Sequence, residues 1–112
     1  MKCRWNRIKK VKMNLKHMYI SHCPASEATL KASSKDLSEY FNKMKENGKE
    51  HGFDVIFWGN PWGVVESYTF VVTSDKSLDK YVEWRGAWSQ AAQKAKLPRY
   101  LPESNTTIVT AF

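Results

Sequence analysis

The stretch that decides the fold is FDVIFWGNPWGVVESYTFVVTSD, residues 53–75. It holds two runs rich in β-branched and aromatic residues, 53–58 and 64–74, and such residues favour strands. Between the runs stands GNPWG, residues 59–63, whose glycines, asparagine and proline favour a turn. The stretch therefore predicts a β-hairpin. Both arms carry apolar residues on both faces, which is typical of strands that are covered on both sides.

A helix is predicted just before the hairpin, over about residues 34–51. Apolar residues recur there at spacings of three and four, as they do on one face of an amphipathic helix. The stripe consists of Leu37, Tyr40, Phe41, Met44 and Gly48. Gly52 is placed to end this helix in the left-handed conformation, which glycine adopts without strain. The preceding segment, residues 24–34, is small and polar and predicts a loop or a weak first helical turn.

A second helix is predicted after the hairpin, over about residues 75–96. Its broad apolar face comprises Leu78, Tyr81, Val82, Trp84, Trp88, Ala91, Ala92 and Ala95. Arg85 falls inside this face at 100° per residue. An unpaired charge in such a place costs several kcal/mol, so Arg85 needs a partner or a path to solvent. The sequence leaves open a carboxylate such as Glu66 or Asp54, a position at the edge of the face, or a bound ligand.

Two further strands complete the pattern. Residues 15–23 alternate, with Met18, Ile20 and His22 on one face, and residues 106–112 alternate as a last strand. The order strand, helix, strand, strand, helix, strand is that of an α+β, ferredoxin-like βαββαβ protomer. It predicts a four-stranded antiparallel sheet with two helices on one face. Because the other face is also apolar, we expect a second copy of the chain to cover it.

The net charge of +7 is concentrated in one segment of the 112 residues. Residues 1–16 contain seven Lys and Arg and no acid, so the remainder is formally neutral. We expect residues 15–112 to form one domain and residues 1–14 to be a basic arm. The arm is open to three interpretations: a leader upstream of a natural start at Met13 or Met18, an arm that docks on acidic partners or nucleic acid, or an extension of the first strand. Nucleic-acid binding is not expected outside residues 1–16.

No run of residues approaches the roughly 18–20 apolar residues of a membrane span. Cys3 and Cys23 form no metal-binding motif. A disulfide between them is one alternative, and reduced thiols in a cytoplasmic protein are the state we expect. We expect neither a metal nor a membrane partner.

The hairpin sequence FDVIFWGNPWGVVESYTFVV, followed by DKSLDKYVEWRGAW, resembles the second half of small proteins of the dimeric α+β barrel superfamily. That superfamily includes antibiotic-biosynthesis-type monooxygenases and stress-responsive barrel proteins. The resemblance is one of pattern over roughly residues 15–112. It implies that protomers pair their open sheet faces into a barrel, often with a pocket between sheet and helices. Many members act on aromatic polyketides or small hydrophobic acids without a cofactor, some bind haem, and many have no known activity.

The resemblance also implies candidate site residues. Counterparts of the aromatic, asparagine and arginine groups of the monooxygenase pocket are Trp58, Asn60, Trp62, Tyr68 and Arg85. Trp88 lies beside Arg85 on the helical face and joins this predicted ligand-binding set. The tryptophans have core or interface packing as their alternative role. Arg85 is predicted to hold a carboxylate or enolate, and His22, at the end of the first strand, is a candidate base. We expect no cofactor; haem, bound through His22, is the alternative.

These observations predict a homodimer that binds a small hydrophobic or aromatic acid, with cofactor-free, monooxygenase-like conversion as an extension. One alternative is a dimer with a purely structural or interaction role. A second alternative is an RNA-recognition-like domain, which shares the βαββαβ order and would use Tyr19, Tyr68 and Phe70 to stack on bases. Against that alternative, the third strand lacks the basic-glycine opening of the RNA-binding motif.

Overall fold

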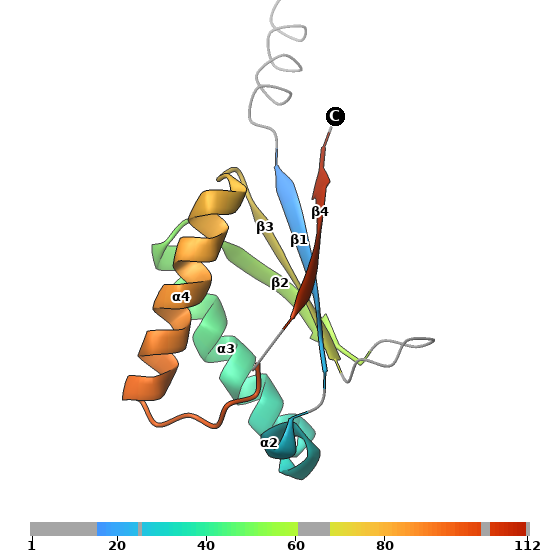
Figure 1. The fold of residues 1–112 in the computed structure, drawn as a ribbon, viewed down its shortest axis with the longest axis vertical. Coiled ribbons are helices and arrows are strands. Elements are labelled where there is room, and N and C mark those ends of the chain that lie inside the picture. The colour runs from blue at the N-terminus through green and yellow to red at the C-terminus, as the bar shows by residue number, and fades with distance from the viewer. Residues whose placement is uncertain (1–15, 25, 61–67, 102–103, 112) are drawn as a thin grey trace, which may run out of the picture.

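The strands form one antiparallel sheet in the order β2-β3-β1-β4 (Figure 1). The structure is a computed structural model that describes residues 16–24, 26–60, 68–101 and 104–111. Along the chain the elements are β1 (His17–Cys23), α2 (Glu27–Lys31), α3 (Ser34–Glu50), β2 (Asp54–Gly59), β3 (Tyr68–Ser74), α4 (Leu78–Lys94) and β4 (Asn105–Thr110). The predicted ferredoxin-like α+β fold is confirmed. The predicted basic arm, Trp62 and residues 64–67 of the predicted third strand lie outside the described residues.

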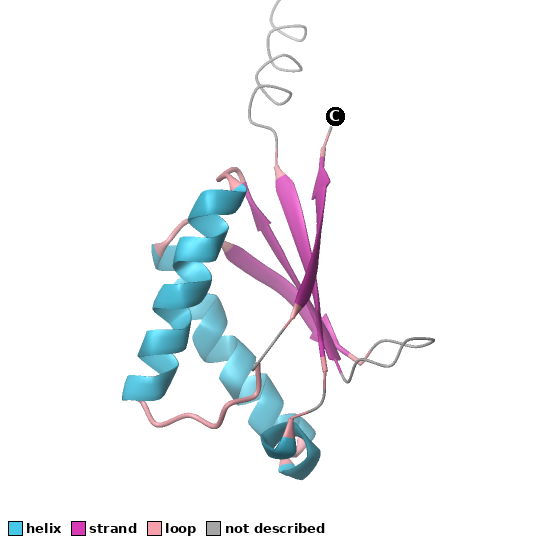
Figure 2. Cartoon of the chain, viewed as in Figure 1, coloured by secondary structure: helices cyan, strands magenta, loops and turns pink. Residues whose placement is uncertain are grey.

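Helices α3 and α4 both lie on one face of the sheet, and the other face is left open (Figure 2). α3 begins at a capping box in which Ser33 and Asp36 exchange hydrogen bonds. It ends before Gly52, whose φ of 83° confirms the predicted left-handed stop. The segment predicted to be a loop or a weak turn contains α2, because Ser26 and Thr29 form a second capping box at its start.

The core fills the space between the sheet and these two helices. Side chains from alternate positions of β1 and β3 point into it, as the period of two requires, whereas the irregularity between Val55 and Phe57 interrupts this alternation in β2. The predicted stripe of α3 is buried from Tyr40 to Gly48, with Leu37 packed at its edge. α4 contributes a stripe narrower than predicted: Tyr81, Trp84, Trp88 and Ala92.

Leu78 and Val82 were predicted to be part of the apolar face of α4, and this was wrong. They are 47% and 61% exposed. Their flank of α4 is left uncovered, because the helix contacts its neighbours through the narrower stripe. Every residue of β4 is likewise exposed. One side of the space between sheet and helices therefore stays accessible, next to Arg85.

The open face of the sheet is mixed rather than uniformly apolar. Met18, Ile20 and His22 of β1 lie on it, as the alternation predicts. Val71 and Phe57, which are paired across β3 and β2, add apolar area, and Phe57 is 64% exposed. Threonines of β3 and β4 lie on the same open face opposite the residues of β1, namely Thr69, Thr73 and Thr107.

Candidate functional site around Arg85

Arg85 projects from the middle of α4 toward the sheet and is half-buried. Its Nη1 donates a hydrogen bond to the Tyr81 hydroxyl at 3.0 Å. Its guanidinium carbon lies 5.0 Å from the centroid of the Phe70 ring and 5.8 Å from that of Tyr81. Aromatic faces attract a cation at such distances, and a guanidinium is well suited to them. The charge is thus held in place by π-systems and a hydroxyl.

The prediction that Asp54 is the carboxylate partner of Arg85 is wrong. Asp54 is bound to Lys45, with the ammonium 3.0 Å from its Oδ1. The ion pairs among the described residues do not include Arg85. Glu66, the other suggested partner, lies outside the described residues.

The Tyr81 hydroxyl connects Arg85 to two strands. The Tyr81 ring stacks on Tyr19, with centroids 4.1 Å apart and planes inclined by 1°. Because a guanidinium is only a donor, the Tyr81 oxygen accepts from Arg85, and its own hydrogen is free for Ser21 Oγ at 3.1 Å. Ser21 Oγ is in turn 2.8 Å from Thr106 Oγ1 on β4. This run of hydroxyls fixes where the guanidinium stands.

A cavity of about 270 Å³ opens beside Arg85, between α4, Tyr40 of α3 and the connector of residues 97–101. Its polar lining consists of Tyr40, Arg85, Ser89, Gln93 and Arg99. Its apolar lining comes from Trp88, Ala92, Leu97, Pro98 and Leu101. Two arginines and, among the described residues, no carboxylate contribute to these walls. The cavity is therefore suited to an anion that carries an apolar body.

The titratable neighbours of Arg85 are uncharged at neutral pH. Burial raises the pKa of the Cys23 thiol to about 11, although the Arg85 charge lowers it. Burial also raises the pKa of Tyr68 and of Tyr40, again against the influence of Arg85. None of these three groups supplies a negative charge to the guanidinium. Within the described residues, the positive charge of Arg85 is left uncompensated.

The structure separates the predicted ligand-binding residues. Trp88 lines the cavity with Arg85. Trp58 stacks on Phe41, with centroids 5.6 Å apart, and packs at the edge of the core. Tyr68 is buried and donates to the Tyr100 carbonyl oxygen. Asn60 is exposed after β2 and lines a different hollow, together with Tyr68.

His22 lies on the open face of the sheet, whereas Arg85 stands over the covered face. The His22 Nδ1 is 2.7 Å from Thr69 Oγ1, and its partner on β4 is Asn105. The two candidate catalytic groups are therefore not brought together in one protomer. The haem alternative fits poorly as well, because the described neighbours of His22 on both flanking strands are polar rather than the apolar wall a haem needs.

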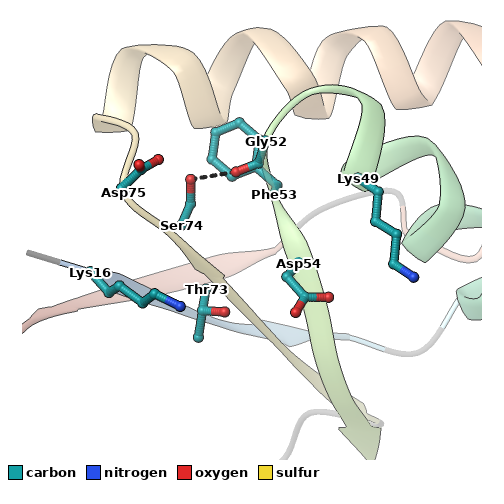
Figure 3. Close-up of a pocket in the computed structure, with 8 residues that line it drawn as sticks. All are labelled: Lys16, Lys49, Gly52, Phe53, Asp54, Thr73, Ser74 and Asp75. Carbon is teal, nitrogen blue, oxygen red and sulfur yellow. Dashed lines mark hydrogen bonds between the residues drawn. The ribbon is translucent and has the colours of Figure 1, made fainter. Parts of the chain in front are cut away.

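A larger hollow, of about 550 Å³, lies where β2 starts and β3 ends (Figure 3). Lys16, Lys49, Asp54 and Asp75 line it, so acids and bases balance. Ser74 Oγ donates to the Gly52 carbonyl oxygen at 2.7 Å, and this contact ties its two walls together (Figure 3). Among the described lining residues, the hollow therefore offers no surplus of either charge.

Three other expectations concern nucleic acid, metal ions and membranes. The RNA-recognition alternative predicted that Tyr19, Tyr68 and Phe70 stack on bases. This is wrong, because all three side chains are buried beneath the helices. Within the described ranges, no cluster of three His, Cys, Asp or Glu side chains is placed to hold a metal ion. The helices in that part of the chain are too short or too polar to cross a membrane.

The sequence interpretation missed Tyr40 and Arg99 as cavity residues. Tyr40 had been assigned to the core stripe of the first helix, and its polar hydroxyl is the signal that could have marked it. Arg99 stands in a proline-flanked connector whose path depends on tertiary contacts. Ser26 Oγ fixes part of that path by donating to the Arg99 carbonyl oxygen at 3.0 Å.

The comparisons with known proteins give information on the fold alone. No protein-family model matches the sequence, and no curated protein matches it either. The structure is similar to the crystal structure of a dimeric ferredoxin-like protein of unknown function from Thermobifida fusca YX. The similarity has a TM-score of 0.50 at 8% sequence identity, and it covers 87% of this chain and 92% of that one.

Proposed function

We propose that the protein binds a small hydrophobic or aromatic acid in the cavity beside Arg85. The observation that carries the proposal is a half-buried guanidinium whose described partners are a hydroxyl and two rings. The described residues that line its cavity include two arginines and no carboxylate. A charge that has already lost part of its hydration shell gains more from a ligand anion than an exposed charge does.

The body of the ligand follows from the rest of the lining. Trp88, Leu97 and Leu101 offer apolar contact, and Trp88 offers a ring edge or face for an aromatic group. The cavity volume of about 270 Å³ is below the roughly 300–1,000 Å³ usual for drug-sized ligands. An acid with one or two rings, or a short branched chain, suits this space.

The proposal covers binding and does not extend to monooxygenase-like turnover. A base is needed for proton abstraction, and it must come within hydrogen-bond reach of the substrate. His22, the candidate base, is on the other face of the sheet from Arg85. Cys23, Tyr40 and Tyr68 keep their protons at neutral pH, and burial raises the pKa of each.

Calorimetric titration with benzoate, 2-naphthoate and their amides tests the proposal. We expect the wild-type protein to bind an acid more tightly than its amide, and Arg85→Met to lose about tenfold or more in affinity for the acid. Lys94→Met is the matched control, because it removes the same charge from an exposed position of the same helix. Equal binding by Arg85→Met and the wild type would rule out this site.

We further propose that two copies pair through their open sheet faces, as in a dimeric α+β barrel. Met18, Ile20 and Val71, on the two central strands, give this face an apolar centre, and Phe57 extends it onto the edge strand β2. The similar protein from Thermobifida fusca YX is described as dimeric, which supports the pairing of two copies of this chain. A stable pair of this kind buries about 1,600 Å² in total.

Light scattering at micromolar concentration tests the pairing. We expect twice the 13.0 kDa mass of the chain. Phe57→Lys should shift the protein to a monomer, because it replaces a strongly exposed apolar side chain of the open face with a charge. Val82→Lys should leave the mass unchanged, since Val82 is as exposed as Phe57 but lies on α4. A wild-type monomer would contradict the proposal.

A further inference from the structure

Tyr40 presents its ring to the cavity in a fixed orientation. The side chain is only 6% exposed. Its ring meets Phe41, Trp88 and Tyr100 edge-on, with centroid distances of 5.6, 5.3 and 5.0 Å. Edge-to-face contacts of this kind are favourable and directional. The position of the Tyr40 hydroxyl is therefore set before any ligand arrives.

The hydroxyl of Tyr40 accepts a hydrogen bond, and among the described residues its own hydrogen is not donated. Trp88 Nε1 donates to the Tyr40 oxygen at 3.0 Å. An indole N–H is only a donor, so the Tyr40 oxygen is the acceptor and its own hydrogen takes no part in this bond. Among the described residues, no group accepts that hydrogen. A buried donor without an acceptor is costly, and this one borders a cavity.

Arg85 and Tyr40 line the same cavity from α4 and α3. Burial raises the pKa of Tyr40, while the Trp88 hydrogen bond and then the Arg85 charge lower it, so the guanidinium acts on this hydroxyl. Because the net direction is upward, the phenol keeps its hydrogen at neutral pH and remains a donor. The cavity therefore holds a charged donor and a neutral donor, each with hydrogen-bonding capacity to spare.

We propose that Tyr40 is a second anion-binding residue of this cavity, and that Arg85 and Tyr40 together hold the carboxylate of the ligand. The guanidinium takes the charge, and the phenol donates to a carboxylate oxygen. This inference rests on the proposed function. It specifies the ligand class as a planar, singly charged carboxylate, because one half-buried guanidinium balances one charge, whereas a phosphate group carries about −1.5 to −2. Arg99 is exposed and is screened by solvent.

Tyr40→Phe is the direct test, since it keeps the ring among its three neighbours and removes only the hydroxyl. In titrations with 2-naphthoate we expect affinity to fall about tenfold relative to the wild type, which is the usual value of a hydrogen bond to a charged group. Tyr19→Phe is the matched control, because its hydroxyl donates to the Lys76 carbonyl oxygen and lies away from the cavity. The control should bind 2-naphthoate as the wild type does.

The outcomes separate this inference from the proposed function. If the wild type binds the acid, Arg85→Met does not, and Tyr40→Phe binds as well as the wild type, the role of Tyr40 is overturned and the Arg85 site stands. If the wild type binds neither acid, both fall. Tighter binding of phenyl phosphate than of benzoate would overturn the assigned ligand class. Should Tyr40→Phe fail to fold, NMR of the wild type decides: a slowly exchanging Tyr40 hydroxyl proton should appear on adding 2-naphthoate, and its absence would contradict the contact.

Discussion

The two flanks of α4 are built differently. On one flank, Trp84 stacks on Phe53 with centroids 5.1 Å apart, and its indole N–H donates to Asn47 Oδ1 at 3.0 Å. Gly48 allows this close fit, because a Cβ there would lie 2.9 Å from the Trp84 ring. On the other flank, Arg85 borders a cavity and has, among the described residues, no carboxylate partner. The comparison teaches that one helix can seal a core on one side and leave unused donors on the other.

The largest expected effect comes from breaking the sealed flank. Trp84→Ala should lower the free energy of unfolding by about 3–5 kcal/mol, because it removes a fully buried ring and leaves a cavity. Urea denaturation measures this loss. Val82→Ala is the control on the exposed flank and should cost less than about 1 kcal/mol. A loss below about 1 kcal/mol for Trp84→Ala would mean that this flank is not sealed.

The pH dependence of the free energy of unfolding measures how far water is excluded from the flank of α4 that carries Arg85. Burial raises the pKa of Cys23 from its ordinary 9.0 to about 11, partly offset by Arg85. The unfolded chain therefore loses this proton at a lower pH than the folded chain, so stability falls as pH rises through that window. Two pH units correspond to about 2–3 kcal/mol.

The measurement compares the wild type with Cys23→Ala by urea denaturation at several pH values. At pH 8.5 the wild type should be the more stable of the two, and its advantage should shrink by about 2–3 kcal/mol by pH 11. Ionisation of the tyrosines in the unfolded chain occurs in both proteins and cancels in the difference. If the difference in free energy of unfolding between the two proteins stayed constant across this pH range, the Cys23 thiol would be hydrated and this flank of α4 would be open to water.

The smallest expected effect concerns residues 1–14, which the sequence predicts to be a basic arm separate from the domain. Removing them should change the free energy of unfolding by less than about 0.5 kcal/mol, as changes outside packed contacts do. Binding of 2-naphthoate should also be unchanged. Any binding to DNA or RNA should vanish with the arm, because the charge surplus resides there. Retained nucleic-acid binding would place it on the domain instead.

Periodicity was sufficient to predict most of the fold. The alternation of residues 17–23, the α3 stripe and the stop at Gly52 depend on local rules, and the structure follows them. Leu78 and Val82 were misplaced because a helical projection shows which residues share a face but not how wide a surface covers it. The same limit hid the pairing of Asp54 with Lys45, a contact between β2 and α3 that depends on tertiary packing.

The candidate site was predicted only in part. Arg85 and Trp88 were found because a charge on an apolar face is visible in the sequence. Tyr40 was not predicted as a site residue. The sequence cannot show that Trp88 Nε1 donates to the Tyr40 oxygen and that the hydroxyl hydrogen of Tyr40 remains available. His22 was grouped with Arg85 because the alternation of β1 did not reveal which of its two faces the helices cover. Both errors concern contacts between elements far apart along the chain.

The most direct test of the account is the free energy of unfolding of Arg85→Met without ligand. If Arg85 is held for a ligand, removing it leaves no buried charge behind, and stability should stay within about 1 kcal/mol of the wild type or rise. If Arg85 is half of a buried ion pair, for example with Glu66, the variant should lose about 3–5 kcal/mol because the carboxylate is left unpaired. We expect the first result; the second would contradict the assignment of Arg85 to a ligand.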